Sequence, residues 1–419
     1  MAEWEPRGCS RSPDAAHPLT HPVVVIGAGA AGLLAALTAA RRGVEVVLVE
    51  STPDGGRKIL ISGGGRCNIL PSVAQPERYV TASSPNTLRK MLRSWPLSEQ
   101  RAFFEAELGM PLVLEEDTGK LFPQSDRARD VRDVLVARVR EAGARIWFDA
   151  RVTDVVQGDE GWTVHLDNAP DIQAKAVVVA TGGLSVPKTG SDGVGLDIAT
   201  ATGHVVTPTY PALTPLLASP HPHAELSGVA TDVSVSSRGI KPAYRGAGAL
   251  LVTHTGWSGP AILDASHVAT TSTPHARADV IIDWIGVDPE RLEESLQAVG
   301  GTVRSVISVR LPRRLADALV REVGAEPATP LAQLTRDDRR AVARGLTAYR
   351  LPWTGDAGYQ KAEVTGGGVR LDQVDPRTME SRHAPGLYFC GEVLDAFGPI
   401  GGHNFLWAWA TGRAAGASV

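Results

Sequence analysis

Hydrophobic residues near the start of the chain follow the pattern of a strand–helix–strand unit. Residues 23–26 form an uninterrupted apolar run, which is typical of a parallel strand buried on both faces. An Ala- and Leu-rich segment to residue 40 predicts a helix that ends at Gly43. A second apolar run at 44–49 finishes in Glu50. We therefore expect an α/β domain with a parallel sheet.

The later pattern extends this domain and then changes character. After Pro187, short β-like runs alternate with Pro, Thr, Ser and Gly, which indicates a mixed or barrel-like β part at 187–287. A helical lobe is predicted at 288–349, and a closing helix at 404–417. The other predicted elements are helices at 86–94, 98–107 and 128–142, strands at 145–148, 175–180 and 386–392, and an antiparallel ribbon at 151–156 and 162–166.

Composition describes an ordinary globular chain. Hydrophobic residues make up 43% and charged residues 21%, which excludes a largely disordered protein. The apolar run at 23–40 is too short and too interrupted by glycine to span a membrane, and residues 1–20, a predicted flexible tail, lack the apolar core of a signal peptide. Cys9, Cys67 and Cys390 lie far apart, which argues against a disulfide scaffold and a zinc site. We expect a cytoplasmic monomer or homodimer with no membrane contact and no metal.

Charge is distributed unevenly. The net charge of −4 provides no overall attraction to nucleic acid, yet ten Arg and only five acidic residues lie between 300 and 350. An Arg-rich helical surface of this kind is favoured as a solvated face, and an acidic or RNA partner at 304–350 is the alternative.

A glycine fingerprint joins the first strand to the first helix. Gly27, Gly29 and Gly32 form a G-x-G-x-x-G motif between a predicted strand and a predicted helix, and Glu50 ends the next strand. In such a motif the glycines allow a tight turn and a close approach of a pyrophosphate to the helix N-terminus, and the acid accepts hydrogen bonds from ribose hydroxyls. A carboxylate at Glu50 repels a 2′-phosphate. Further Gly-rich loops at 55–68, 181–183 and 401–402 favour a long ligand, FAD, over NAD.

The loop at 56–68 carries the residues that identify a family. Its sequence resembles the G-x-K-x-x-x-S-G-x-G-R-C-N signature of the HI0933-like (YhiN, or aminoacetone-oxidase-like) flavoproteins. Supporting similarity lies at 117–123, 180–193, 253–260, 364–369, 376–381 and 386–395. The closing motif at 401–409 and a shortened segment at 187–193 depart from the usual pattern, as in a smaller, uncharacterised subgroup. The resemblance covers 22–416.

The resemblance implies a Rossmann-type FAD-binding domain of the two-dinucleotide-binding-domain class. This domain is discontinuous, at 21–186 plus 350–419, and 187–349 is inserted into it. The implied and inferred cofactor-binding residues are Gly27, Gly29, Ala30, Ala31, Gly32, Glu50, Ser51, Arg57, Lys58, Ser62, Gly63, Gly64, Arg66, Cys67, Asn68, Val152, Ala180, Thr181, Gly182, Gly183, Gly391, Glu392, Gly401, Gly402, His403, Asn404 and Phe405.

Four residues are candidates for catalysis: His403, Lys120, Lys188 and His254. His403 opens the last predicted helix and is either a proton donor to the reaction or a helix-capping side chain. Lys120, Lys188 and His254 lie in family motifs expected to face the substrate, although an ordinary turn is the favoured reading of His254. For Cys67, a buried inert thiol is favoured over a flavin neighbour.

Three functions remain open. The favoured one is an FAD-dependent oxidoreductase of a small molecule, which oxidises an amine or amino-ketone with O₂ or reduces a C=C bond with transiently bound NAD(P)H. The alternatives are an RNA-modifying, uridine-reducing flavoenzyme and a non-catalytic flavin-binding redox protein.

Overall fold

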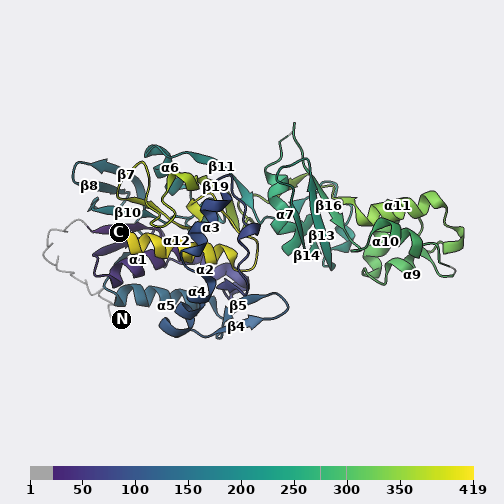
Figure 1. Ribbon diagram of the computed structural model, residues 1–419, viewed down its shortest axis with the longest axis horizontal. Coiled ribbons are helices and arrows are strands. Elements are labelled where there is room, and N and C mark those ends of the chain that lie inside the picture. The colour runs from purple at the N-terminus through teal and green to yellow at the C-terminus, as the bar shows by residue number, and fades with distance from the viewer. Residues whose placement is uncertain (1–21, 274, 299) are drawn as a thin grey trace, which may run out of the picture.

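A computed structural model describes residues 22–273, 275–298 and 300–419 (Figure 1). The predicted tail at 1–20 lies outside these residues. The molecule is elongated: a larger α/β domain forms one end, an antiparallel sheet lies in the middle, and a small helical lobe forms the other end.

The larger domain is built on a parallel sheet with the strand order β20-β10-β1-β2-β6. Four of its strands are entirely buried, as their all-apolar sequences require. The register aligns Ile26 with Val49 and with Val179, so the chain leaves all three strands at one edge of the sheet. The strands are β1 (Val23–Ile26), β2 (Val46–Val49), β6 (Arg145–Trp147), β10 (Ala176–Val179) and β20 (Leu387–Phe389).

Helix α1 (Ala30–Arg41) packs against α12 (His403–Ser418), although the two helices are far apart in the sequence (Figure 1). The two backbones touch: a Cβ added at Gly412 would lie 2.3 Å from the carbonyl oxygen of Ala31, and one at Gly416 would lie 2.2 Å from that of Ala35. Helix α5 (Ala128–Glu141) also packs against α1. None of the helices in the described ranges is long and apolar enough to cross a membrane.

Smaller elements complete the larger domain. The larger domain also contains two three-stranded antiparallel sheets, β3-β5-β4 and β7-β8-β9, and β11 pairs with β19. The remaining elements here are α2 (Arg57–Ile61), β3 (Leu70–Pro71), α3 (Pro85–Arg93), α4 (Leu97–Ala102), β4 (Leu112–Glu115), β5 (Lys120–Pro123), β7 (Val152–Gly158), β8 (Gly161–Leu166), β9 (Ile172–Ala174), α6 (Val194–Ala201), β11 (Val206–Ala212) and β19 (Val364–Val369).

The inserted domain is an antiparallel sheet of seven strands against which α7 packs, followed by the helical lobe. The strand order is β17-β16-β13-β14-β15-β12-β18. Its elements are β12 (Leu216–Leu217), β13 (Ala230–Arg238), β14 (Arg245–Val252), β15 (Gly256–Ser258), α7 (Pro260–Thr270), β16 (Asp279–Asp283), α8 (Pro289–Ser295), α9 (Val303–Ile307), α10 (Arg313–Glu322), α11 (Arg336–Thr347), β17 (Tyr349–Arg350) and β18 (Gly355–Asp356).

The buried apolar residues place the inserted domain later in the sequence than the predicted 187–349. Leu196 and Ile198 of α6 belong to the hydrophobic core of the larger domain. The core of the inserted domain runs from Leu216 to Trp353. The prediction followed a change in composition, which marks loops and does not show which core a helix joins.

Candidate functional site

A cleft of about 670 Å³ opens at the carboxyl edge of the parallel sheet. Its size is within the range of small-molecule and cofactor sites, and in open α/β sheets ligands bind at this edge. Its walls come from the first βαβ unit, α2 and the loop after it, the turn after β10, the segment before β19, and the N-terminal end of α12. Of the predicted cofactor and catalytic residues, those that line it are Gly27, Gly29, Ala30, Ala31, Glu50, Ser51, Arg57, Lys58, Ser62, Gly63, Gly64, Arg66, Asn68, Lys120, Val152, Ala180, Thr181, Gly182, Lys188, Gly391, Glu392, Gly401, Gly402, Asn404 and Phe405.

The three fingerprint glycines have different surroundings. Gly27 has φ +99°, and a Cβ there would lie 2.7 Å from the carbonyl oxygen of Ala180. A Cβ at Gly32 would lie 1.8 Å from the carbonyl oxygen of Gly27. A Cβ at Gly29 would meet no protein atom within 4 Å, and Gly29 lines the cleft. Two of the glycines therefore shape the turn, and Gly29 leaves space on the cleft side.

Backbone N–H groups at the N-terminus of α1 lie next to that space. N–H groups in the first turn of a helix have no acceptor within the helix, and the helix dipole adds positive potential there. Ala30 and Ala31, in this turn, line the cleft, and the turn contains no acidic residue. This end of the cleft therefore fits a pyrophosphate.

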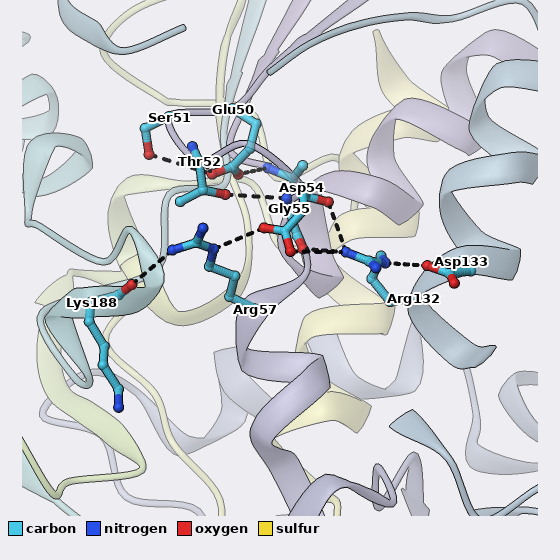
Figure 2. Close-up of polar contacts among 10 residues, drawn as sticks. Glu50, Ser51, Thr52, Asp54, Gly55, Arg57, Arg132, Asp133 and Lys188 are labelled. Atoms are coloured by element: carbon cyan, nitrogen blue, oxygen red, sulfur yellow. Dashed lines mark hydrogen bonds and ion pairs between the residues drawn. The ribbon is translucent and has the colours of Figure 1, made fainter. Parts of the chain in front are cut away.

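Glu50 lies beside this helix end with its carboxylate fixed (Figure 2). One oxygen accepts a hydrogen bond from the N–H of Ala28 at 2.7 Å, and the other accepts one from the N–H of Thr52 at 2.8 Å. The side chain is buried, yet it reaches the cleft wall. A carboxylate held in this way retains lone pairs for vicinal hydroxyl groups, as a ribose presents them.

Arg57 connects the two sides of the cleft near Glu50 (Figure 2). Its guanidinium pairs with Asp54 at 2.9 Å and donates to the carbonyl oxygen of Lys188 at 3.3 Å. The Lys188 side chain extends away from this contact and is exposed. The Arg57 contacts hold the turn at 187–189 against the loop that follows β2.

A half-buried ion pair forms the middle of the cleft. The Lys58 ammonium lies 2.7 Å from the Glu392 carboxylate, which also accepts hydrogen bonds from the Ser185 hydroxyl (2.7 Å) and the Thr365 N–H (3.0 Å). The predicted cofactor role of Glu392 thus falls on a carboxylate that already has three protein partners. Gly183 does not line the cleft; a Cβ there would lie 2.4 Å from the Thr365 hydroxyl.

At the far end of the cleft the 56–68 loop meets the start of α12. The Asn68 amide accepts a hydrogen bond from the Gly402 N–H (2.9 Å) and donates one to the carbonyl of Leu70 (3.2 Å). Gly401 and Gly402 line the cleft and lead into this second helix N-terminus, which has no acidic residue in its first turn. A negative charge that develops at this end would be stabilised.

Arg66, one of the predicted cofactor-binding residues, lines the cleft but is engaged by two acidic side chains. It pairs with Glu115 at 3.1 Å and Asp126 at 3.6 Å, and its guanidinium lies 4.0 Å from the centre of the Phe122 ring. The charge of Arg66 is therefore largely neutralised at the cleft mouth.

Two predicted catalytic residues lie away from the cleft. His254 is exposed in the turn between β14 and β15 of the inserted domain. His403 is buried beside Tyr79, whose hydroxyl donates to the His403 carbonyl oxygen at 2.6 Å. Burial lowers the pKa of the His403 imidazole to about 4, so this ring is neutral at pH 7. The His403 ring thus lies in the core and outside the cleft wall.

Gly32 and Cys67 also lie outside the cleft wall. Cys67 is fully buried, and burial raises the pKa of its thiol to about 12. A thiol with such a pKa is an inert core group at neutral pH.

Sequence reasoning missed the wall formed by the segment before β19. Gln360, Lys361 and Glu363 line the cleft, as do Gly190 and Asp192 from the turn after β10. The second group lies inside a family motif that we had recognised. The first group precedes one, and we found no local signal in it.

Comparisons with known proteins cover both domains. A family model described as the HI0933-like protein Rossmann domain matches residues 21–418. A ribosomal RNA dihydrouridine synthase of Escherichia coli is 33% identical over 93% of this chain and 95% of its own length. A 3-dehydro-bile acid delta(4,6)-reductase of Clostridium scindens is 31% identical over 94% of this chain and 98% of its own length.

Proposed function

The chain belongs to the HI0933-like family, and from this premise we propose that it reduces a carbon–carbon double bond conjugated to a carbonyl group. The protein is an FAD-dependent oxidoreductase with a Rossmann-type cofactor domain. FAD, when bound, supplies the hydride chemistry, and the protein supplies position and electrostatics. We propose NADH or NADPH as the transient electron donor.

The chemistry in the names of the relatives favours this reaction over amine oxidation. Dihydrouridine is uridine with two hydrogens added across a ring double bond that is conjugated to a carbonyl. A delta(4,6)-reductase acting on a 3-dehydro bile acid adds hydrogens to double bonds conjugated to the 3-carbonyl. Both relatives align with this chain over nearly their full length. The shared reaction is hydride addition to an electron-poor alkene.

The observation that carries the proposal is the position of Lys120. It lines the cleft at the far end, and a Cβ at Gly401 would lie 3.9 Å from its Cε. An ammonium group here, beside the N-terminus of α12, would polarise a substrate carbonyl and stabilise the negative charge that forms on its oxygen. Lys361 also lines the cleft and adds a second cation to its wall.

An anaerobic absorbance experiment tests the proposal. The purified protein with FAD should bleach near 450 nm on addition of NADH or NADPH, and the colour should return when a 3-oxo-4,6-diene steroid or a uridine-containing RNA is added without air. Lys120→Met should slow this reoxidation about 10²-fold, since one donor to a developing oxyanion contributes this much. Reoxidation only by O₂, with an amine as the reductant, would overturn the proposal in favour of an oxidase.

The second candidate differs only in substrate: a uridine in RNA. The observation that favours it is the surface of the helical lobe, at the end of the molecule remote from the larger domain (Figure 1). Seven exposed arginines of this lobe form no ion pair with any described residue: Arg291, Arg310, Arg313, Arg314, Arg321, Arg336 and Arg344. Unpaired guanidinium groups bind phosphates by releasing counterions.

A salt titration separates the two substrates. RNA binding through this surface should weaken steeply with salt, and each Arg→Gln change that removes a phosphate contact should lower the slope of log K against log[salt] by about 1. Arg304, which pairs with Asp317 at 2.6 Å, offers a matched control whose loss should leave the slope unchanged. If RNA binding is absent or does not depend on salt, RNA is rejected as the substrate and the small-molecule substrate is favoured.

A further inference from the structure

The cleft contains four carboxylates, and three of them are held by hydrogen-bond donors. Glu50 accepts two backbone N–H groups, and Glu392 pairs with Lys58. Asp192 pairs with Arg151 at 3.0 Å and accepts the Val194 N–H at 3.2 Å. Among the described residues, the fourth carboxylate, that of Glu363, has no hydrogen-bond or ion-pair partner. A carboxyl group without donors is the one free to carry and release a proton.

The backbone fixes Glu363 firmly even though its carboxyl group is free. Its N–H donates to the carbonyl oxygen of Leu213 at 3.2 Å, and its own carbonyl oxygen accepts from the Ser185 hydroxyl at 3.3 Å. The next residue, Val364, starts β19 and is buried against Phe397. Successive side chains of an extended segment point to opposite sides, so Glu363 faces the cleft and remains solvent-accessible there.

Charged groups on neighbouring elements act on Glu363 in opposite directions. Crowding by the protein raises the pKa of its carboxyl group above the usual value, the Asp264 charge on α7 raises this pKa further, and the Lys120 ammonium on β5 lowers it. Lys361, two residues before Glu363, also lines the cleft. The charge of Lys58 is neutralised by Glu392, which also accepts a hydrogen bond from Ser185. The pKa of the Glu363 carboxyl group is therefore above the ordinary value of a glutamate, so its protonated form persists to higher pH.

Other acids near this end are unsuited to the task. His403 is buried outside the cleft wall. Asp264 also lies outside the wall, and its two oxygens are taken by the Ile400 N–H (2.7 Å) and the Arg78 guanidinium (2.9 Å).

We propose that Glu363 is the catalytic acid that delivers a proton to the α-carbon of the substrate, in the same cleft as the carbonyl-polarising Lys120. This inference rests on the proposed function. FAD, when bound and reduced, would supply the hydride for the β-carbon of the conjugated alkene, and Lys120 would stabilise the negative charge that this places on the carbonyl oxygen. The α-carbon then takes the proton as the O–H bond of Glu363 breaks. The substrate gains two electrons and two hydrogens, and the Glu363 carboxylate is reprotonated by water at the open cleft.

The test compares Glu363→Gln with Glu363→Asp in the FAD-bound protein, and Glu116→Gln, an exposed glutamate outside the cleft, is the matched control. After anaerobic reduction, each protein is mixed with the 3-oxo-4,6-diene steroid, and cofactor reoxidation is timed across pH. Loss of a general acid typically costs 10²–10⁴-fold. We expect Glu363→Gln to slow reoxidation about 10²-fold or more and to abolish the decline of the rate at high pH. FAD binding should be unchanged, Glu363→Asp should restore part of the rate, and the control should match the unaltered protein.

A readout independent of turnover is the titration of ¹³Cδ-labelled glutamates by NMR. One signal, absent in Glu363→Gln, should titrate above the usual glutamate range, and Lys120→Met should move it higher because the ammonium group lowers this pKa. If the unaltered protein reduces the steroid and Glu363→Gln is equally fast, the inference is overturned while the proposed function stands. If the unaltered protein reduces neither the steroid nor a uridine-containing RNA, the proposed function falls, and the inference with it.

Discussion

Two alanine substitutions in the fingerprint turn separate the binding of a pyrophosphate from the shape of the turn itself. Gly29 has φ −78° and ψ −173°, a conformation that alanine adopts freely, and its added methyl group would meet no protein atom within 4 Å. The methyl group of Gly32→Ala would lie 1.8 Å from the carbonyl oxygen of Gly27. The first change therefore acts on a ligand, and the second acts on the fold.

The magnitudes follow from these distances. Nonbonded heavy atoms rest about 3.5 Å apart, so Gly32→Ala must displace backbone, and we expect a loss of about 3 kcal/mol or more in the free energy of unfolding. Gly29→Ala at the N-cap should cost only about 0.5–1 kcal/mol. Hydrogen bonds to a charged group contribute about 1.5–3 kcal/mol each, so loss of one phosphate contact should weaken FAD binding about 10- to 150-fold.

FAD binding to the apoprotein can be measured by quenching of flavin fluorescence, and the fold by thermal melting of the same samples. Gly29→Ala should melt within a few degrees of the unaltered protein and bind FAD at least about 10-fold more weakly. Gly32→Ala should melt much lower. Unchanged FAD affinity in a folded Gly29→Ala protein would show that the pyrophosphate does not lie at the N-terminus of α1, and would refute the assignment of this end of the cleft.

Three further changes test other parts of the structure. Burial raises the pKa of Asp264 to about 6 from its ordinary 3.8, so this group stabilises the folded state below pH 4, and the contribution disappears as the pH rises through 6. The melting temperature of Asp264→Asn, measured relative to that of the unaltered protein, should therefore be higher at pH 7.5 than at pH 4. An equal difference in melting temperature at both pH values would refute this. Lys58→Met leaves the Glu392 charge half-buried without a cation and should destabilise by about 3 kcal/mol in denaturant unfolding, a loss that adding Glu392→Gln should largely reverse. Thr335→Ala removes the side-chain cap on the Asp338 N–H (3.1 Å) and should cost about 1 kcal/mol in the same assay; no change would show that the cap contributes nothing.

Local sequence was sufficient for the first half of the cleft. The strand, the turn glycines and Glu50 lie within 28 residues. The cofactor site needs a tight turn and an acid at the end of a strand, and both can be recognised from the order of residues alone. The predicted strand at 175–180 corresponds to β10, and the predicted closing helix at 404–417 corresponds to α12.

The direction of individual side chains could not be predicted in the same way. His403 stands in a glycine-rich motif that faces the cleft, but packing against Tyr79 turns its ring into the core. Glu363 faces the cleft because its neighbour Val364 packs into a core formed by distant segments. Its carboxyl group has no hydrogen-bond partner among the described residues because those distant segments place no donor within reach of it. Neither outcome is encoded by spacing along the chain.

The contact between α1 and α12 also has a consequence for how the protein is made. The 361 residues from Arg42 to Gly402 separate the two helices, so at about 5–20 residues per second a ribosome needs roughly 20–70 s to reach the second after it completes the first. During this interval the surface of Ala31 and Ala35 has no covering helix, although the inserted domain between them has its own core and can already fold. Until α12 has been synthesised, the core of the nucleotide-binding domain is therefore incomplete, because Trp407, Trp409 and other buried residues of α12 belong to it.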